Sequence, residues 1–366
     1  MKPLVVAALA GSIVVAVALL APTPARSAEA TWLEGMARAA RGWLAALPRT
    51  DGAQVPFASE ARRDWHCVPR SRPGLALRDM TEPQRAAATA LLRAGLSTKG
   101  ADRAAAIMAL ESVLADLEGS SRRFRDPLNY AFVVFGTPGV VPWGWRVEGH
   151  HLSVNVTVAA EGRAAFTPLF TGSNPARVPS GPRAGERLQT DEVELALALV
   201  SSLDARQLAA ATLRGRSFGD IVAGPGRLDA LATPEGLLAT ELTEAQRATL
   251  VRLIETYVGL ARDEFGRPYL ELVRAGLDAT RFAWAGGTRH GTAYYYRVHG
   301  PRVWIELDNT QGGGNHVHSL WRDPVDDFGR DDLRAHYAAA AQGHGGVADP
   351  AKGAAPVAPP VPAGPR

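Results

Sequence analysis

The residues best able to do chemistry lie close together near the carboxyl end of the chain. His316 and His318 are two positions apart in the stretch 315–322, NHVHSLWR. In a β-strand, residues two apart point to the same side and lie roughly 6–7 Å apart, so two imidazoles can converge on one cation. Imidazole is the commonest metal-ligating side chain and suits zinc, copper and iron. The spacing predicts part of a metal site; the alternative is two polar histidines at a strand end.

Carboxylates precede this pair on a predicted hairpin. Residues 294–298 favour β-structure, 299–302 contain Gly and Pro and predict a turn, and apolar residues alternate with polar ones over 303–308. Glu306 and Asp308 share the polar face of the second strand. We expect Glu306 or Asp308 to complete a metal site or to act as an acid or base beside it. Arg322 is the third predicted catalytic residue, because a guanidinium binds anionic groups in a bidentate manner.

Two further histidines complete the candidate ligand set. His151 heads the polar face of a predicted strand at 150–159, and His336 lies one helical turn after Asp332 in a predicted short helix. We expect three of the four to bind one divalent transition metal (zinc, copper or iron), leaving a position for water or a small-molecule substrate. Such a metal lowers the pKa of bound water towards 7, which suits a hydrolase, and an oxidative enzyme is the other expectation. The four predicted ligands are His151, His316, His318 and His336.

Several long strings of this sequence resemble a family of uncharacterised bacterial and fungal proteins, domain of unknown function 3500. The resemblance rests on the stretch 316–337, on the hairpin 295–306, on 151–155 (HLSVN) and on 170–175 (FTGSNP). Together these strings lie within residues 60–340. The resemblance implies a shared fold, but it implies no activity and no catalytic residues, so the functional argument depends on the chemistry of the side chains.

Composition narrows the class of protein. The chain has 366 residues, of which 46% are hydrophobic, enough for one large core. Its formal net charge is only +3, and no basic run is interleaved with aromatic residues, so nucleic-acid binding is not expected. Cys67 is the only cysteine, which excludes an intramolecular disulfide.

The two ends of the chain differ from its middle. Lys2, an apolar run over 4–20 and Ala28-Glu29-Ala30 predict a secretory signal at 1–30, and hence a periplasmic or extracellular protein that contacts a membrane only through this segment. An uncleaved membrane anchor is the alternative. Residues 343–366 are rich in Gly, Ala, Pro and Val and predict a disordered tail. A single domain is expected over 31–342.

Apolar periodicity predicts an α+β fold, in which a largely antiparallel sheet from 130–160 and 292–321 packs against a helical layer. Thr81, Asp204 and Thr243 are each followed three residues later by Gln, which predicts capping boxes at three helix starts. Because their spacing is uneven, we interpret them as independent helices and not as a repeat. Residues 138–142 predict a turn, and 167–189 predict a loop that acts as a polar lid, an anion-binding loop or a plain cover. The predicted helices are 31–47, 81–96, 100–118, 190–201, 204–213, 243–260 and 263–276.

A binding protein without a metal is the alternative function. Tyr294 to Tyr296, Trp304 and Trp321 could line a pocket for an anionic or sugar-like ligand, held by arginines. The sequence has no Gly-x-Ser-x-Gly motif for a serine hydrolase, whereas a glycosidase that uses Glu306 and a second acid stays open. The arginines of this predicted pocket are Arg297, Arg302, Arg322, Arg330 and Arg334.

Overall fold

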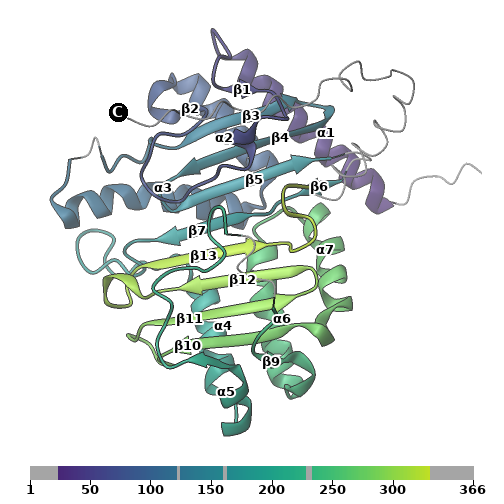
Figure 1. Cartoon of the computed structure of the whole chain (residues 1–366). Helices are drawn as coiled ribbons and strands as arrows, with labels where there is room; N and C mark the ends of the chain where they lie inside the picture. The colour runs from purple at the N-terminus through teal and green to yellow at the C-terminus, as the bar shows by residue number, and fades with distance from the viewer. Residues whose placement is uncertain (1–23, 122–123, 160–162, 228–232, 330–366) are drawn as a thin grey trace, which may run out of the picture.

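One sheet of thirteen strands extends through the described part of the chain (Figure 1). The computed structural model describes residues 24–121, 124–159, 163–227 and 233–329. The main path of the sheet runs through β1 (Gln54–Val55), β3 (Ala131–Thr137), β4 (Val140–Gly149), β5 (Leu152–Val158), β7 (Leu169–Ser173), β13 (Val317–Arg322), β12 (Val303–Asp308), β11 (Tyr294–Gly300), β10 (Arg281–Gly286) and β8 (Thr212–Arg214). Off this path, β2 (Leu75–Ala76) pairs with β3, β6 (Ala164–Ala165) with β5, and β9 (Leu237–Leu238) with β10. Among these strands only β1 with β3 and β8 with β10 are parallel, which confirms the predicted α+β class.

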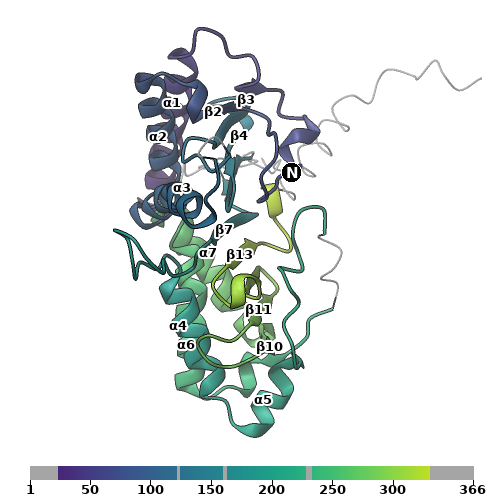
Figure 2. The ribbon, with the colours of Figure 1, turned by 90° about the vertical axis from the view of Figure 1, so that its left-hand side faces the viewer.

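The helices gather on one face of the sheet, and long loops cover the other (Figure 2). Each predicted helix is present, and each predicted capping box forms: the Gln side chain accepts from the backbone N–H of Thr81, Asp204 or Thr243 at 2.8–3.0 Å. None of the helices in the described residues is long and apolar enough to span a membrane. The α-helices are α1 (Pro24–Ala45), α2 (Glu82–Gly95), α3 (Thr98–Glu118), α4 (Thr190–Ser201), α5 (Ala205–Ala211), α6 (Glu244–Val258) and α7 (Asp263–Ala275).

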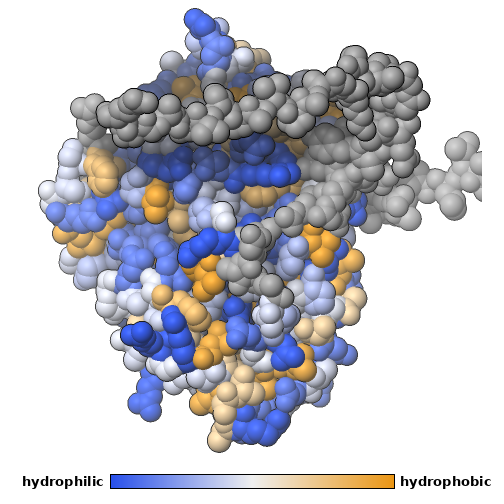
Figure 3. Space-filling model, in the orientation of Figure 1, coloured by the Kyte–Doolittle hydropathy of each residue, from blue (hydrophilic) through white to orange (hydrophobic). Residues whose placement is uncertain are grey.

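The two faces of the sheet are buried in different ways. The apolar residues of β5, from Leu152 to Val158, pack into the large core under the helices, as their alternation predicted. On the other face, Trp304, Leu320 and Phe170 form a smaller core beneath the loops. The polar residues of β5 also point to this face, and Ser153 and Asn155 are buried there. The outer surface of the loops on this side is mixed in polarity (Figure 3).

The fold is a duplication, which the sequence interpretation missed. The order α1, β1, β2, α2, α3, β3, β4, β5, β7 recurs as α4, β8, β9, α6, α7, β10, β11, β12, β13, with α5 and β6 as additions. The hairpins β4–β5 and β11–β12 have the same register when 151 is added to the residue numbers of the first hairpin. Arg146 pairs with Asn155 in the first hairpin, and Arg297 pairs with Glu306 in the second. The prediction of independent helix starts at Thr81 and Thr243 is therefore wrong.

A pseudo-twofold axis relates the two halves. Val154 of β5 and Ile305 of β12 are equivalent by the hairpin register, and they pair with Leu169 and Trp321 respectively. Leu169 and Trp321 also pair with each other where β7 meets β13. The axis therefore passes between β7 and β13, and the two halves share one continuous sheet.

Three local predictions need correction. Residues 167–189 are not one loop, because 169–173 form β7, the strand that joins the two halves. The turn predicted at 138–142 is shorter, since β4 begins at Val140 and includes Pro142. Strand β10 lay in a stretch for which no element was predicted.

Some predictions fall outside the described residues. They concern the segment 1–23 of the predicted signal, the predicted tail 343–366, and the residues Arg330, Asp332, Arg334 and His336. Residues 24–30, the last part of the predicted signal, belong to α1.

Candidate metal centre

Three of the four predicted ligand histidines meet at one end of the β7–β13 pair. The Nε2 atom of His316 lies 2.8 Å from Nε2 of His151 and 3.1 Å from Nε2 of His318. Nε2 of His151 and Nε2 of His318 are 3.2 Å apart. His151 and His318 are buried, and His316 is half-buried. The fourth predicted ligand, His336, lies outside the described residues.

His151 reaches the cluster from the tight turn between β4 and β5. Its backbone has φ = 61°, a left-handed conformation that is uncommon for a residue with a side chain. Its N–H donates to the carbonyl of Cys67 (3.0 Å), and its own carbonyl accepts from the N–H of Gly172 (2.8 Å). A Cβ atom on Gly172 would lie 3.0 Å from the His151 ring, so the absence of a side chain there makes room for the imidazole.

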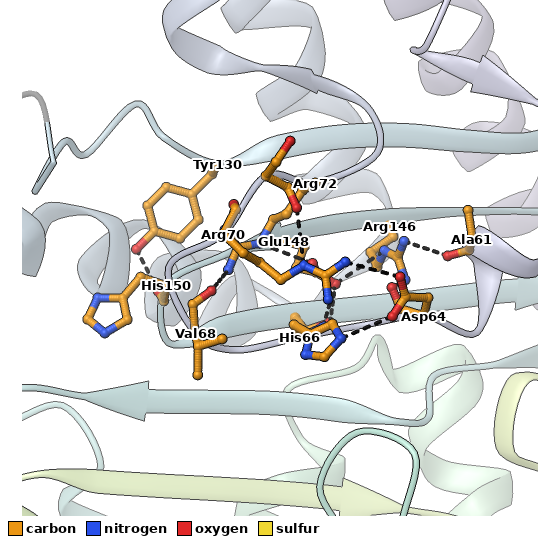
Figure 4. A network of polar contacts seen from close by, with 12 residues as sticks. Ala61, Asp64, His66, Val68, Arg70, Arg72, Tyr130, Arg146, Glu148 and His150 are labelled. Atoms are coloured by element: carbon orange, nitrogen blue, oxygen red, sulfur yellow. Dashed lines mark hydrogen bonds and ion pairs between the residues drawn. The ribbon is translucent and has the colours of Figure 1, made fainter.

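A buried ion pair fixes the segment that supports His151. Glu148 accepts from the backbone N–H of His66 (3.0 Å) and pairs with Nε of Arg72 (3.0 Å). Figure 4 shows Glu148 and Arg72 side by side on the loop-covered face of the sheet. The side chains of Arg72 and Glu148 are 4% and 3% exposed, so water screens their attraction little. The segment from His66 to Arg72 thus holds the carbonyl of Cys67 against the His151 turn.

His150 lies beneath the cluster. It sits in the β4–β5 turn, where its ring stacks on His151 with centroids 3.8 Å apart. Its Nδ1 lies 2.5 Å from a carboxylate oxygen of Glu111, and its carbonyl accepts from the hydroxyl of Tyr130 (2.8 Å; Figure 4). His150 therefore supports the turn that carries His151, through its ring stack and its polar contacts.

His316 and His318 come from the start of β13. His318 lies between Gly172 of β7 and Asp308 of β12 in the sheet. His316 precedes the strand by one residue and follows three glycines with positive φ, Gly312 to Gly314, that turn the chain back. The two imidazoles point to the same side, as the spacing of two residues predicted.

Asp220 supports the cluster from a loop, and no sequence signal indicated it. Its carboxylate lies 2.6 Å from Nδ1 of His318, which leaves Nε2 of that ring to face the other two histidines. Burial by itself raises the pKa of Asp220, but the hydrogen bond and charge interaction with His318 and the Ile221 N–H outweigh it and lower that pKa. Metal-bound histidines commonly donate their other N–H to a carboxylate in this way.

Glu306, predicted to be catalytic, holds the loop that carries Asp220. Its carboxylate accepts from the backbone N–H groups of Val222 and Ala223, from Trp304 Nε1 (2.8 Å) and from the hydroxyl of Tyr295 (3.0 Å). Burial raises the pKa of Glu306, and these donors oppose that change. Four donors occupy its two oxygens, so its contacts are those of a structural anchor.

The other two predicted catalytic residues differ in their contacts. Arg322 donates from Nε to Asp327 (2.5 Å) and from Nη1 to the carbonyl of Ala223 (2.8 Å), so it also supports the Asp220 loop. Asp308 lies opposite His318 in the sheet and accepts from the N–H and hydroxyl of Thr310 at 2.8 and 3.0 Å. Burial is the main cause that raises the pKa of Asp308, and the charge of Asp220 adds to it.

Burial keeps two of the histidines neutral. It lowers the pKa of His151 well below 6.5, and the imidazoles of His150, His318 and His316 add to the effect. Burial and then the neighbouring His318 lower the pKa of His316 to about 4. Neutral imidazole is the form that binds a metal, because the lone pair of the ring nitrogen is then free.

The cluster has the dimensions of a metal site. An ion with bonds of about 2.0–2.1 Å to imidazole nitrogens holds them about 3.3–3.4 Å apart in a tetrahedral site, and about 2.9–3.0 Å apart in an octahedral one. The three Nε2 separations, 2.8, 3.1 and 3.2 Å, are close to both. The three histidines can therefore hold one ion after small ring movements.

The arginine and aromatic pocket of the alternative prediction does not form among the described residues. Tyr294, Tyr295, Tyr296, Trp304 and Trp321 are all buried. Tyr294, Tyr296 and Trp321 belong to the large core, and Trp304 belongs to the smaller one. Each described arginine of that set pairs with a carboxylate: Arg297 with Glu235, Arg302 with Asp323, and Arg322 with Asp327.

Comparison with known proteins gives a family but no activity. Residues 29–330 match the family described as protein of unknown function (DUF3500). The chain therefore belongs to this family, as its motifs indicated. No match was found among curated proteins or among solved structures.

Proposed function

We propose that this chain is an exported protein whose three histidines, His151, His316 and His318, bind one divalent transition metal as the centre of an enzyme active site. The observation that carries the proposal is the convergence of three Nε2 atoms within 3.2 Å of one another, with a carboxylate on Nδ1 of His318. Uncharged nitrogen lone pairs that face one another repel, and a shared cation removes that repulsion.

The proposed chemistry is metal-assisted hydrolysis or oxidation of a small molecule. Three protein ligands leave at least one coordination position for water or substrate, and a bound ion lowers the pKa of that water towards 7. Asp308 is the carboxylate we assign to proton transfer, because it lies opposite His318 and burial raises its pKa. Glu306 and Arg322 act in this proposal through the Asp220 loop and not on the substrate.

Export is supported by the charge and apolar pattern of the first thirty residues. The family match begins at residue 29, close to the end of the predicted signal. Intact mass measurement of the protein secreted by its source cells tests this part, with loss of roughly the first thirty residues as the expected result. Recovery of the full-length mass from the mature fraction would contradict it.

Metal content tests the central part of the proposal. Purified wild-type protein should carry about one transition-metal ion per chain by inductively coupled plasma mass spectrometry, since one three-histidine site holds one ion. The double variant His316→Ala/His318→Ala should carry none. The control is His290→Ala, which removes an exposed histidine outside the cluster and should keep the metal. Wild-type protein that folds well and takes up no metal from solution would contradict the proposal.

A further inference from the structure

A cavity of about 470 Å³ lies on the helix-covered face of the sheet, behind the histidine cluster. Val317 of β13 and Ser173 of β7 line it, whereas the alternate residues His318 and Gly172 face the cluster on the other side. Successive residues of a strand point to opposite faces, so the sheet separates the cavity from the histidines. A ligand in this cavity would not touch a metal held by them.

The outer wall of the cavity is a hairpin-like loop. Arg177 and Arg187 form an isolated bridge at its base, and Val178 and Glu186 are joined by a backbone hydrogen bond of 3.0 Å. Asn315 fixes this wall to the start of β13, because its side chain accepts from the N–H of Arg177 (2.7 Å) and donates to its carbonyl (3.0 Å). This is the segment that the sequence analysis singled out as a polar lid or an anion-binding loop.

The charges around the cavity do not cancel. Glu194 pairs with Arg187 (2.7 Å) and with His290 (3.0 Å). The guanidinium of Arg177, also in the lining, has no hydrogen-bond or ion-pair partner among the described residues. One full positive charge is therefore left at the cavity without a counter-charge from its lining.

The remaining lining suits a polar molecule. Tyr294 is among the residues that line the cavity, and burial, followed by the charge of Glu194, raises the pKa of its hydroxyl, which stays protonated. The cavity has the volume of a small-ligand site, about 300–1,000 Å³. A guanidinium with free donors binds a carboxylate through two parallel hydrogen bonds.

We infer that this cavity binds a small polar monocarboxylate of the size of a sugar acid, with its carboxylate on Arg177. A dianion such as a phosphate monoester fits less well, because the lining offers one uncompensated positive charge and Glu194 would repel a second negative one. This site is separate from the proposed metal centre and does not depend on it.

Calorimetric titration of the full chain tests this inference. The probes are D-glucuronate and D-glucose, a sugar acid and its uncharged counterpart. Wild-type protein should bind glucuronate saturably and at least tenfold more tightly than glucose. Arg177→Gln should weaken glucuronate binding at least tenfold, because the variant keeps the backbone bonds to Asn315 and loses only the charge. Arg289→Gln, which removes an exposed arginine that does not line the cavity, should bind as the wild type does.

Three results would overturn the inference: no saturable binding of glucuronate, equal binding of glucose, or unchanged binding in Arg177→Gln. The variant His316→Ala/His318→Ala separates this site from the metal centre and should bind glucuronate as the wild type does. Loss of binding in that variant, with retained binding in Arg177→Gln, would place the sugar acid at the histidines instead.

Discussion

The two halves of the molecule, residues 24–173 and 190–329, have the same scaffold but different side chains at equivalent ends. The turn of the β4–β5 hairpin places His151 against His316 and His318. At the equivalent position of the β11–β12 hairpin stands Arg302, which is held by both oxygens of Asp323 at 2.7–3.1 Å. The segment 163–168, which corresponds to 315–320, contains no histidine. One end of the duplicated sheet can hold a metal, whereas the equivalent position at the other end carries the Arg302–Asp323 ion pair.

The comparison shows which features the fold needs and which the site needs. Gly74 and Gly236 are equivalent, with φ of +110° and +107°. In each half a Cβ there would overlap a backbone carbonyl, that of Phe132 or of Phe282, the strand residues that pair with Leu75 and Leu237. A feature present in both halves serves the scaffold. Among the described residues, a histidine cluster supported by an aspartate occurs at only one of the two equivalent ends of the sheet.

The largest expected loss of stability therefore comes from a matched pair of glycine substitutions. Gly74→Ala and Gly236→Ala should each lower the free energy of unfolding by about 2–4 kcal/mol, since each combines an unfavourable positive φ with a steric overlap. Denaturation by urea measures both. If one substitution were tolerated and the other were not, the two glycines would not have the equivalent roles that the duplication implies.

A smaller effect is expected at the equivalent pair Glu306 and Asn155. Glu306→Gln turns an amide NH₂ towards N–H donors, leaving a buried donor unsatisfied, and should cost about 1–3 kcal/mol of stability. Because the Asp220 loop depends on Glu306, metal affinity should also fall by roughly 10–100-fold. Competition with a chelator measures the affinity.

Asn155→Ala is the control for that prediction. Its amide donates to Ser153 and to the carbonyl of Pro168 and has no contact with the loop, so this variant should lose stability and keep its metal affinity. Equal loss of metal affinity in both variants would show that the effect at position 306 is a general loosening of the fold.

Much of the scaffold could be predicted from the sequence, because local signals determine it. The Gln residues three positions after Thr81, Asp204 and Thr243 indicated where three helices begin. The alternation of apolar and polar residues over 303–308 indicated β12. Strand β7 was missed because its residues 169–173 include Gly172 and lie between prolines, so the turn-like composition hid a buried strand. Its run of Leu169 and Phe170 was the signal that could have found it.

The duplication was within reach of the sequence. Residues 74–85, GLALRDMTEPQR, and 236–247, GLLATELTEAQR, align without gaps. The interval is 162 residues there but 151 at the hairpins, because α3 and the segment after it are longer than α7 and the segment after that helix. The additional capping box at Asp204 obscured the pattern further.

The candidate site was only partly predictable. The pairing of His316 with His318 follows from strand geometry, whereas their meeting with His151 depends on β7 lying between β5 and β13. Asp220 could not be found, because a single acid in an irregular loop carries no periodic signal. Glu306 was predicted to be catalytic because it lies on the polar face of its strand. Its neighbours in the sequence do not reveal that four donors surround its carboxylate.

The most direct test is a crystal structure of the protein grown with a transition metal, with diffraction recorded on both sides of the absorption edge of that metal. The account predicts one strong anomalous peak about 2.0–2.1 Å from Nε2 of His151, His316 and His318, and none at Arg302. A well-ordered structure in which the three rings turn away from one another, or in which the ion binds elsewhere, would contradict it.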